Sequence, residues 1–237
     1  MAAQDEQELF DLVDEAGRPL GVRKARGLVH RDGDWHRSLH VWVLLARGVV
    51  EDGGEDGGAG AAEGREPWVL LQRRSTAKDT WPGALDVAVT GHYAAGEQLE
   101  DALREAEEEI GLPLTPSDIF KVGVRRRVDV HAPPIVDREV QDVLLAVTPR
   151  GLADLRPAPD EISALLALPL GAALALARGE AEAAPALELA APSAAPIAVT
   201  VRLADFVGAP DGYYKYALES IARRLAGEEP AAWTLGP

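Results

Sequence analysis

The side chains in this sequence with the clearest capacity for chemistry are Glu105, Glu108 and Glu109, which fall within a few residues of one another. Residues three or four apart share one face of a helix, so a helix here would project the three carboxylates together. Carboxylate oxygens on a rigid element, completed by water and substrate phosphates, form the ligand shell that Mg²⁺ prefers. Arg104 offers a counter-charge and would orient a glutamate through a charge-assisted hydrogen bond. The cluster predicts a divalent-cation site, with a solvated acidic helix face as the alternative.

The residues around this cluster carry the signals of a strand followed by a glycine loop and a helix. A strand at residues 85–89 is predicted to deliver the chain to Gly91, and a helix is predicted over residues 98–110. Gly111 ends the helix, and a proline follows two residues later. Apolar residues at spacings of three or four mark the buried face of the helix: Leu99, Ala102, Leu103, Ala106 and Ile110.

The order of these residues resembles the Nudix box, the signature of hydrolases that act on nucleoside diphosphates linked to another group. The matching residues are, in order, Gly91, Glu97, Arg104, Glu105, Glu108, Glu109, Gly111 and Leu112. Two departures are present: Glu97 and Arg104 are one residue closer than in the family pattern, and Ala106 takes an aliphatic position. The missing residue lies before Arg104, so the register of the three glutamates is kept, but the direction of Glu97 is left open.

The resemblance implies an α+β fold, with the family's α/β/α sandwich around a mixed sheet, and metal-dependent hydrolysis of a diphosphate linkage. Glu105 and Glu109 would then be principal ligands of Mg²⁺ or Mn²⁺, and Glu108 a further ligand or a catalytic base. A backbone carbonyl near Gly91 would add an oxygen ligand. Arg104 would belong to the catalytic group by orienting a glutamate.

A second set of residues is similar to the Nudix branch that includes type I isopentenyl diphosphate isomerase. Residues 81–92 run from Trp-Pro-Gly through a strand into Gly-His, as in that branch, and the resemblance covers roughly residues 8–150. The isomerase holds a metal with histidines and with two acids on a late strand. The matching positions here are His36, His92, Asp137 and Glu139, with His30 a looser candidate because its spacing to His36 is off by one. Glu139 is also a candidate general base.

The isomerase reaction needs a catalytic cysteine, and this chain contains no cysteine. The complete Arg-Glu-x-x-Glu-Glu order, which the isomerase lacks, favours hydrolysis of a small phosphorylated metabolite instead. An isomerase-like enzyme and a module that binds a diphosphate ligand without turnover remain the alternatives. If the chain is a hydrolase rather than an isomerase-like enzyme, the histidines are expected to have a structural role rather than to bind a metal.

Three residues upstream of the box are candidates for substrate binding. Arg73 and Arg74 form a local basic patch that could meet phosphate groups, and Trp81 could stack on a ring. The alternatives are an exposed strand face for the arginines and a buried core position for the tryptophan. A second patch, residues 125–127, has the same two interpretations.

Composition narrows the class of protein. The net charge is −15, which disfavours long nucleic acids because binding them requires neutralising phosphates with basic groups. No apolar run approaches the roughly 20 residues needed to span a bilayer, and the N-terminus is acidic. The absence of cysteine excludes disulfides and thiolate zinc sites. We expect a cytoplasmic protein without a membrane partner, and the sequence leaves a homodimer open.

The expected organisation has three parts. Residues 1–35 form an N-terminal hairpin and the approach to the core, residues 36–165 the Nudix core, and residues 166–237 an Ala-rich connector, a strand and a C-terminal helix packed on the core. A mobile acidic hairpin loop is expected at residues 51–66, which are too polar and glycine-rich to bury anything. Further strands are expected at residues 9–13, 20–23, 38–45, 68–72, 121–130, 140–147 and 197–203, and further helices at residues 170–178 and 213–225.

Overall fold

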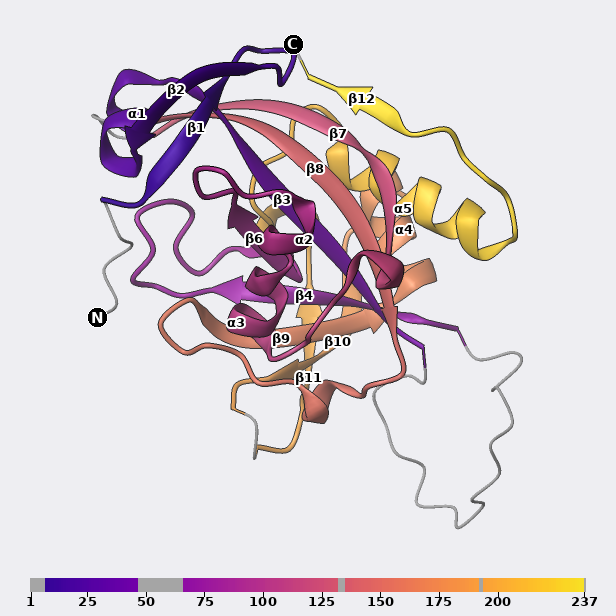
Figure 1. Cartoon of the computed structure of the whole chain (residues 1–237). Helices are drawn as coiled ribbons and strands as arrows, with labels where there is room; N and C mark the ends of the chain where they lie inside the picture. The colour runs from indigo at the N-terminus through magenta and orange to yellow at the C-terminus, as the bar shows by residue number, and fades with distance from the viewer. Residues whose placement is uncertain (1–6, 47–65, 132–134, 192–193, 237) are drawn as a thin grey trace.

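A computed structural model describes residues 7–46, 66–131, 135–191 and 194–236. The expected acidic loop therefore lies, apart from Glu66, outside the described residues. One mixed sheet organises the chain, in the strand order β11-β10-β9-β4-β3-β8-β7-β12 (Figure 1). The strands on this path are β3 (Trp35–Leu45), β4 (Trp68–Arg74), β7 (Ile119–Val130), β8 (Val136–Thr148), β9 (Ile162–Pro169), β10 (Ala184–Leu189), β11 (Ile197–Val201) and β12 (Trp233–Leu235).

Helices cover both faces of the sheet, so the expected α/β/α sandwich is confirmed. On one face lie α2 (Leu99–Ala102) and α3 (Arg104–Ile110), whose apolar residues join one core cluster with β3 and β8. On the other face, α4 (Leu170–Arg178) and α5 (Tyr213–Leu225) join a second core cluster with β4 and β9. Side chains alternate across a strand, which is why each central strand supplies both cores.

The N-terminal segment forms the predicted hairpin and a short helix at one end of the sheet (Figure 1). Strand β1 (Leu9–Val13) pairs antiparallel with β2 (Pro19–Ala25) and reaches β3 through Leu12 and His36. Helix α1 (Arg26–Asp32), which the sequence did not predict, follows β2 directly and ends at Gly33 in the left-handed region. This helix carries His30 to the end of β3 and β8.

Two predicted elements are each divided in the structure. The predicted helix over residues 98–110 is two short helices that meet at Leu103, where the Ala106 amide bonds the Leu103 carbonyl rather than a carbonyl four residues back. This tighter turn coincides with the stretch that is one residue shorter than the family pattern. The predicted strand at residues 85–89 is likewise two strands, β5 (Leu85–Val87) and β6 (Val89–His92), which pair with β4 and β3 respectively.

The C-terminal third contributes more strands than expected. Residues 184–189, expected to be a loose connector, form β10, which pairs antiparallel with β9 on one side and β11 on the other. The boundary expected at residues 165/166 falls inside β9, which pairs with β4 at the centre of the sheet. Helices α4 and α5 have the bounds that the sequence predicted. No helix among the described residues is long and apolar enough to cross a membrane.

Candidate active site

The register of three neighbouring strands places polar side chains in rows across one face of the sheet. Residues two apart on a strand share a face, so Asp137, Glu139 and Gln141 point the same way from β8. The pairing sets His36 of β3 and Arg127 of β7 on either side of Glu139. A buried charged row of this kind needs mutual partners or a ligand, since isolated buried charges are costly.

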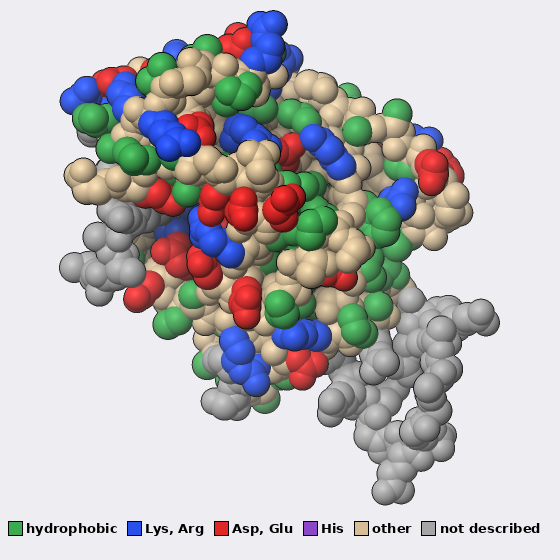
Figure 2. Space-filling model, in the orientation of Figure 1, with side chains coloured by type: hydrophobic (Ala, Val, Ile, Leu, Met, Phe, Trp, Pro, Cys, Tyr) green, Lys and Arg blue, Asp and Glu red, His purple; other side chains and the backbone are tan. Residues whose placement is uncertain are grey.

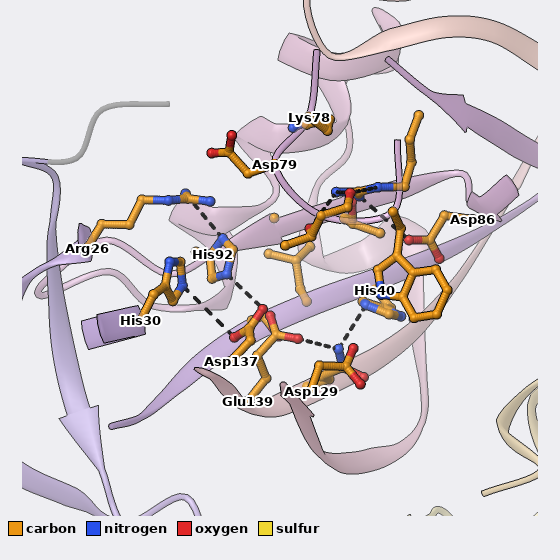
Figure 3. A pocket seen from close by; sticks show the side chains of 18 of the residues that line it. Arg26, His30, His40, Lys78, Asp79, Asp86, His92, Asp129, Asp137 and Glu139 are labelled. Atoms are coloured by element: carbon orange, nitrogen blue, oxygen red, sulfur yellow. Dashed lines mark hydrogen bonds and ion pairs between the residues drawn. The ribbon is translucent and has the colours of Figure 1, made fainter. Parts of the chain in front are cut away.

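Three histidines and one aspartate meet at the end of this row (Figure 3). His30 comes from α1, His36 from β3, His92 from β6 and Asp137 from β8, and one potential ligand atom of each lies within 4.8 Å of the others. The Nε2 atoms of the three histidines and Oδ1 of Asp137 are buried without a hydrogen-bond partner. Phe10 stacks on His36 and His92 at 5.2 and 5.0 Å between ring centroids and closes one side of the group.

The electrostatics of this three-histidine group suit a metal ion. Burial lowers the pKa of His30 to about 4 and that of His92 to about 3, and it lowers the pKa of His36 as well. The imidazoles are therefore neutral at pH 7, the form that donates a lone pair to a metal. Burial and the charge of Glu139 raise the pKa of Asp137. Four buried, partnerless donor atoms that converge are a good fit to a divalent cation.

Glu139 adjoins the group. Its Oε1 lies 3.2 Å from Nε2 of His92, and its Oε2 accepts a hydrogen bond of 2.7 Å from the amide of Gln141. Burial alone would raise the pKa of Glu139, but its contact with Nε2 of His92 holds it well below its usual range. Glu139 is thus an anion at neutral pH and a weak base.

The acidic helix supplies a second set of carboxylates on the other side of Gly91. Glu109 is buried, and its Oε2 accepts hydrogen bonds from the Thr90 amide at 3.1 Å and from Gln72 at 3.4 Å. Glu105 lies against Gly91 so closely that a Cβ there would be 2.4 Å from its Cγ, which explains the glycine at this position. Burial raises the pKa of Glu105 to about 7, and burial together with the charge of Glu105 raises that of Glu109.

Arg104 binds three carboxylates of the box at once. Its guanidinium donates to Glu97 at 2.9 Å, to Glu105 at 2.8 Å and to Glu108 at 2.9 Å. The shortened spacing therefore leaves Glu97 directed at Arg104, which answers the question that the sequence left open. The side chain of Glu108 is 60% exposed, so it lies at the rim, whereas Glu105 and Glu109 lie inside.

The three-histidine group and the carboxylates of the box differ in how closely their potential ligand atoms converge. Within the described parts of the chain, the three-histidine group is the set whose potential ligand atoms all lie within 4.8 Å of one another. Glu105, Glu108 and Glu109 line the same cleft without forming such a set. Arg104 bonds Glu105 and Glu108, whereas the buried Glu109 is bonded by the Thr90 amide and Gln72.

Both sets open into one cleft of about 770 Å³. Figure 3 shows Arg26, His30 and His92 at one end and His40 and Asp86 at the other, with Lys78 between them. Cations that line the cleft are Arg26, Arg31, Arg74, Lys78, Arg104 and Arg127. Figure 2 shows acidic side chains gathered on the face over α2 and α3, with no histidine visible there.

The three predicted substrate-binding residues separate in the structure. Arg74 lines the cleft, where it contacts Asp86 at 3.7 Å and the Thr80 carbonyl at 3.0 Å. Trp81 also lines the cleft and is 38% exposed. Arg73, on the opposite face of β4, pairs with Glu188 of β10 at 2.6 Å and is not a cleft residue.

Several cleft residues were not predicted from the sequence. Arg26, Lys78 and Asp86 carried no motif of their own, and Arg127 belonged to a patch whose direction was open. Strand alternation could have found Arg127, because residues 125 and 127 share a face of β7. Lys78 forms an ion pair with Glu161, a contact between distant segments that no local pattern encodes.

The raised pKa of Glu105 predicts a pH-dependent stability in the metal-free protein. Between its usual pKa near 4.5 and about 7, the folded state holds a proton that the unfolded state releases, so stability falls as pH rises through this range. Glu105→Gln should therefore be more stable than wild type at pH 8 by roughly 1–2 kcal/mol, with a smaller difference at pH 5. Urea unfolding in EDTA measures this, and an equal difference at both pH values would contradict it.

Comparison with known proteins gives the family. The NUDIX domain model matches residues 59–190. An uncharacterized Nudix hydrolase of Clostridium acetobutylicum is 34% identical over 56% of this chain and 56% of its own length, and Nudix hydrolase 3 of Arabidopsis thaliana is 40% identical over 48% of this chain and 13% of its length. An isopentenyl-diphosphate Delta-isomerase of Paenarthrobacter aurescens is 31% identical over 66% of this chain and 73% of its length. The chain thus spans about half of the first relative and a small part of the second. It belongs to the Nudix family, on a branch similar to the isopentenyl-diphosphate isomerases.

Proposed function

We propose that this protein hydrolyses a diphosphate linkage in a small phosphorylated metabolite with the help of Mg²⁺ or Mn²⁺. The observation that carries the proposal is the pair of the half-buried Glu105 and the buried Glu109, carboxylates of a Nudix box whose pKa values burial raises in a cleft lined by cations. Buried carboxylates so close together need a counter-charge, because two like charges about 5.5 Å apart repel by roughly 3 kcal/mol at an effective dielectric of 20.

Glu105 and Glu109 would hold the cation, with the carbonyl of Gly91 as a further ligand. When bound, the cation would neutralise charge on the phosphoryl oxygens and lower the pKa of a water. Arg104 keeps Glu105 in place through its bond of 2.8 Å. Glu108 is the box carboxylate open to solvent and receives the proton of the attacking water. The three-histidine group, with Glu139 beside it, would hold a second cation.

Arg74 and Lys78 would bind the diphosphate. Both line the cleft near the box, and burial together with the charge of Arg74 lowers the pKa of Lys78. A cation placed against another cation is stabilised by an anionic ligand, which a diphosphate supplies. Trp81 would contact the group attached to the diphosphate.

Adjacent arginines give a matched test of diphosphate binding. Arg74→Met should lower kcat/KM about 10- to 100-fold, since a hydrogen bond to a charged group is worth about 1.5–3 kcal/mol. Arg73→Met removes the same chemistry from the other face of β4 and should leave kcat/KM within about twofold of wild type. Steady-state kinetics compare the two variants, and equal losses would contradict the assignment of Arg74.

Isomerisation of isopentenyl diphosphate is the second candidate, favoured by the convergence of His30, His36, His92 and Asp137. The chain has no cysteine to serve as the isomerase's thiol. Charged and polar side chains also line the cleft beyond the histidines, namely Asp86, Arg127, Asp129 and Gln141. A hydrocarbon group gains little in such surroundings, because it would leave these polar groups without water.

A substrate panel with Mg²⁺ tests the proposal against its alternatives. The panel contains ADP-ribose, dinucleotide polyphosphates, CoA and isopentenyl diphosphate, and products are identified by mass and chromatography. Hydrolysis of at least one member supports the proposed function. Formation of dimethylallyl diphosphate without phosphate release would support the isomerase instead. Tight binding without any product would support a binding module, and either of these last outcomes overturns the proposal.

A further inference from the structure

A chain of buried polar side chains runs from Glu139 through Gln141 and His40, which also line the cleft, to the C-terminal segment. The amide oxygen of Gln141 accepts from Arg125 at 3.4 Å, which fixes the orientation of this amide. Its nitrogen then has two protons to donate, one to Oε2 of Glu139 at 2.7 Å and one to Nε2 of His40 at 3.1 Å. Gln141, His40 and Arg125 are all more than nine-tenths buried. The bonds of Gln141 to Arg125 and to His40 are therefore protected from water.

The same logic fixes the tautomer of His40. Its Nε2 accepts from Gln141, and burial lowers its pKa to about 4, so the single ring proton sits on Nδ1. Nδ1 donates to the Tyr213 hydroxyl oxygen at 3.0 Å, which also accepts from the indole of Trp42 at 3.0 Å. The ring of His40 is thus held from both sides, and it holds the amide of Gln141 in turn.

The far end of this chain is anchored in the C-terminal segment. Asp211 pairs with both nitrogens of one edge of Arg125, at 2.6 and 2.9 Å, and the guanidinium lies 4.3 Å from the ring centre of Tyr213. Asp211 and Tyr213 stand at the start of α5, beyond residues 59–190 that match the family model. The residues outside the matched domain thereby reach the carboxylate beside the three-histidine group.

We propose that Gln141 is a positioning residue that directs Oε1 of Glu139 at the three-histidine group, and that the start of α5 holds Gln141 through His40 and Arg125. The proposal rests on the metal centre put forward at that group, but not on the reaction. Without the Gln141 bond, the Glu139 carboxylate is free to rotate away from His92. The C-terminal segment then supports the geometry of the metal site.

Binding of Co²⁺ alone, followed by visible absorption and calorimetry, tests this. Wild type should bind Co²⁺ with the spectrum of a nitrogen-ligated ion, and His36→Gln should remove that signal. Gln141→Met keeps the side-chain size but removes the amide, and it should weaken Co²⁺ binding about 10- to 100-fold, as loss of an outer partner of a metal ligand does. The readout is independent of hydrolysis, so failure of the proposed reaction would leave it unaffected.

Two neighbouring tyrosines provide the matched pair. Tyr213→Phe removes the hydroxyl that holds His40, whereas Tyr214→Phe removes an equally buried hydroxyl that donates to the Val207 carbonyl at 2.9 Å. Tyr213→Phe should weaken Co²⁺ binding several-fold and Tyr214→Phe should not, even if both lower the melting temperature. The two tyrosine variants test the positioning role of Gln141 even if Gln141→Met fails to fold. Wild-type affinity in Tyr213→Phe, equal losses in the two variants, or no Co²⁺ binding by wild type would overturn the proposal.

Discussion

Glu109→Gln is expected to abolish metal-dependent phosphate release while leaving the fold intact. Glu109 is buried between the Thr90 amide and Gln72, so the substitution removes an ionisable carboxyl group from the interior of the cleft without changing the size of the side chain. Turnover should fall at least about a hundredfold, the cost of losing one preorganised charge at a reacting phosphate. Because burial disfavours the charged form of Glu109, the variant should unfold at an equal or higher temperature in EDTA.

Glu107→Gln is the control for this variant. Glu107 belongs to the same helix but is exposed and does not line the cleft. Initial rates of phosphate release at saturating Mg²⁺, together with melting curves, compare the two proteins. Wild-type turnover in Glu109→Gln would refute the role of the box carboxylates, and a loss in Glu107→Gln as large as that in Glu109→Gln would show that the helix matters for another reason.

His36→Gln is expected to remove one equivalent of bound metal. His36 is fully buried, and its Nε2 points at His30, His92 and Asp137 without a hydrogen-bond partner. Loss of one of four ligands should weaken binding at this group at least about a hundredfold, since outer partners alone account for 10- to 100-fold. Metal content after gel filtration, measured by elemental mass spectrometry, reports the loss.

His131→Gln is the matched control, because His131 contacts Trp81 at the cleft wall and lies outside the three-histidine group. It should retain the metal content of wild type. A wild-type metal content in His36→Gln would mean that the group is a structural histidine cluster, the interpretation that the sequence held open for these residues.

The fold was predictable where the signal is local. The Ala- and Leu-rich composition predicted α4 and helical spacing predicted α5, both with the bounds observed, and the Nudix resemblance predicted the layered architecture that the family match confirms. The division at Leu103 was not predicted, although the missing residue before Arg104 was visible. A shortened motif shows that a helix must change, but the place of the change depends on packing against the sheet.

Pairing between distant segments limited how much of the fold could be predicted from the sequence. The residues of β10 are read as a connector because the chain there is rich in alanine and proline, yet β9 and β11 supply hydrogen bonds on both sides. Propensity is a weak guide where tertiary pairing decides. Lys78 was not predicted as a cleft residue for a similar reason, since its partner Glu161 is far away in the sequence.

The position of His30 shows how the structure compensates for a changed spacing between His30 and His36. Its distance to His36 departs by one residue from the isomerase pattern, which made it the looser candidate. Helix α1 ends at Gly33 with a φ of 68°, a left-handed turn that brings the end of the helix back against β3 and β8. His30 thereby joins the group with His36 and Asp137. The turn could be inferred from the glycine, but its effect on His30 could not.

Hydrolysis in water enriched in ¹⁸O, with the substrate that the panel identifies, tests the central proposal most directly. If the box carboxylates support attack of water on phosphorus, mass spectrometry should find one ¹⁸O in a phosphate-containing product when Mg²⁺ is present and no product in EDTA. Glu109→Gln should give neither label nor product. Turnover that yields an unlabelled isomer, or labelled product at the same rate in EDTA, would contradict metal-dependent diphosphate hydrolysis by this protein.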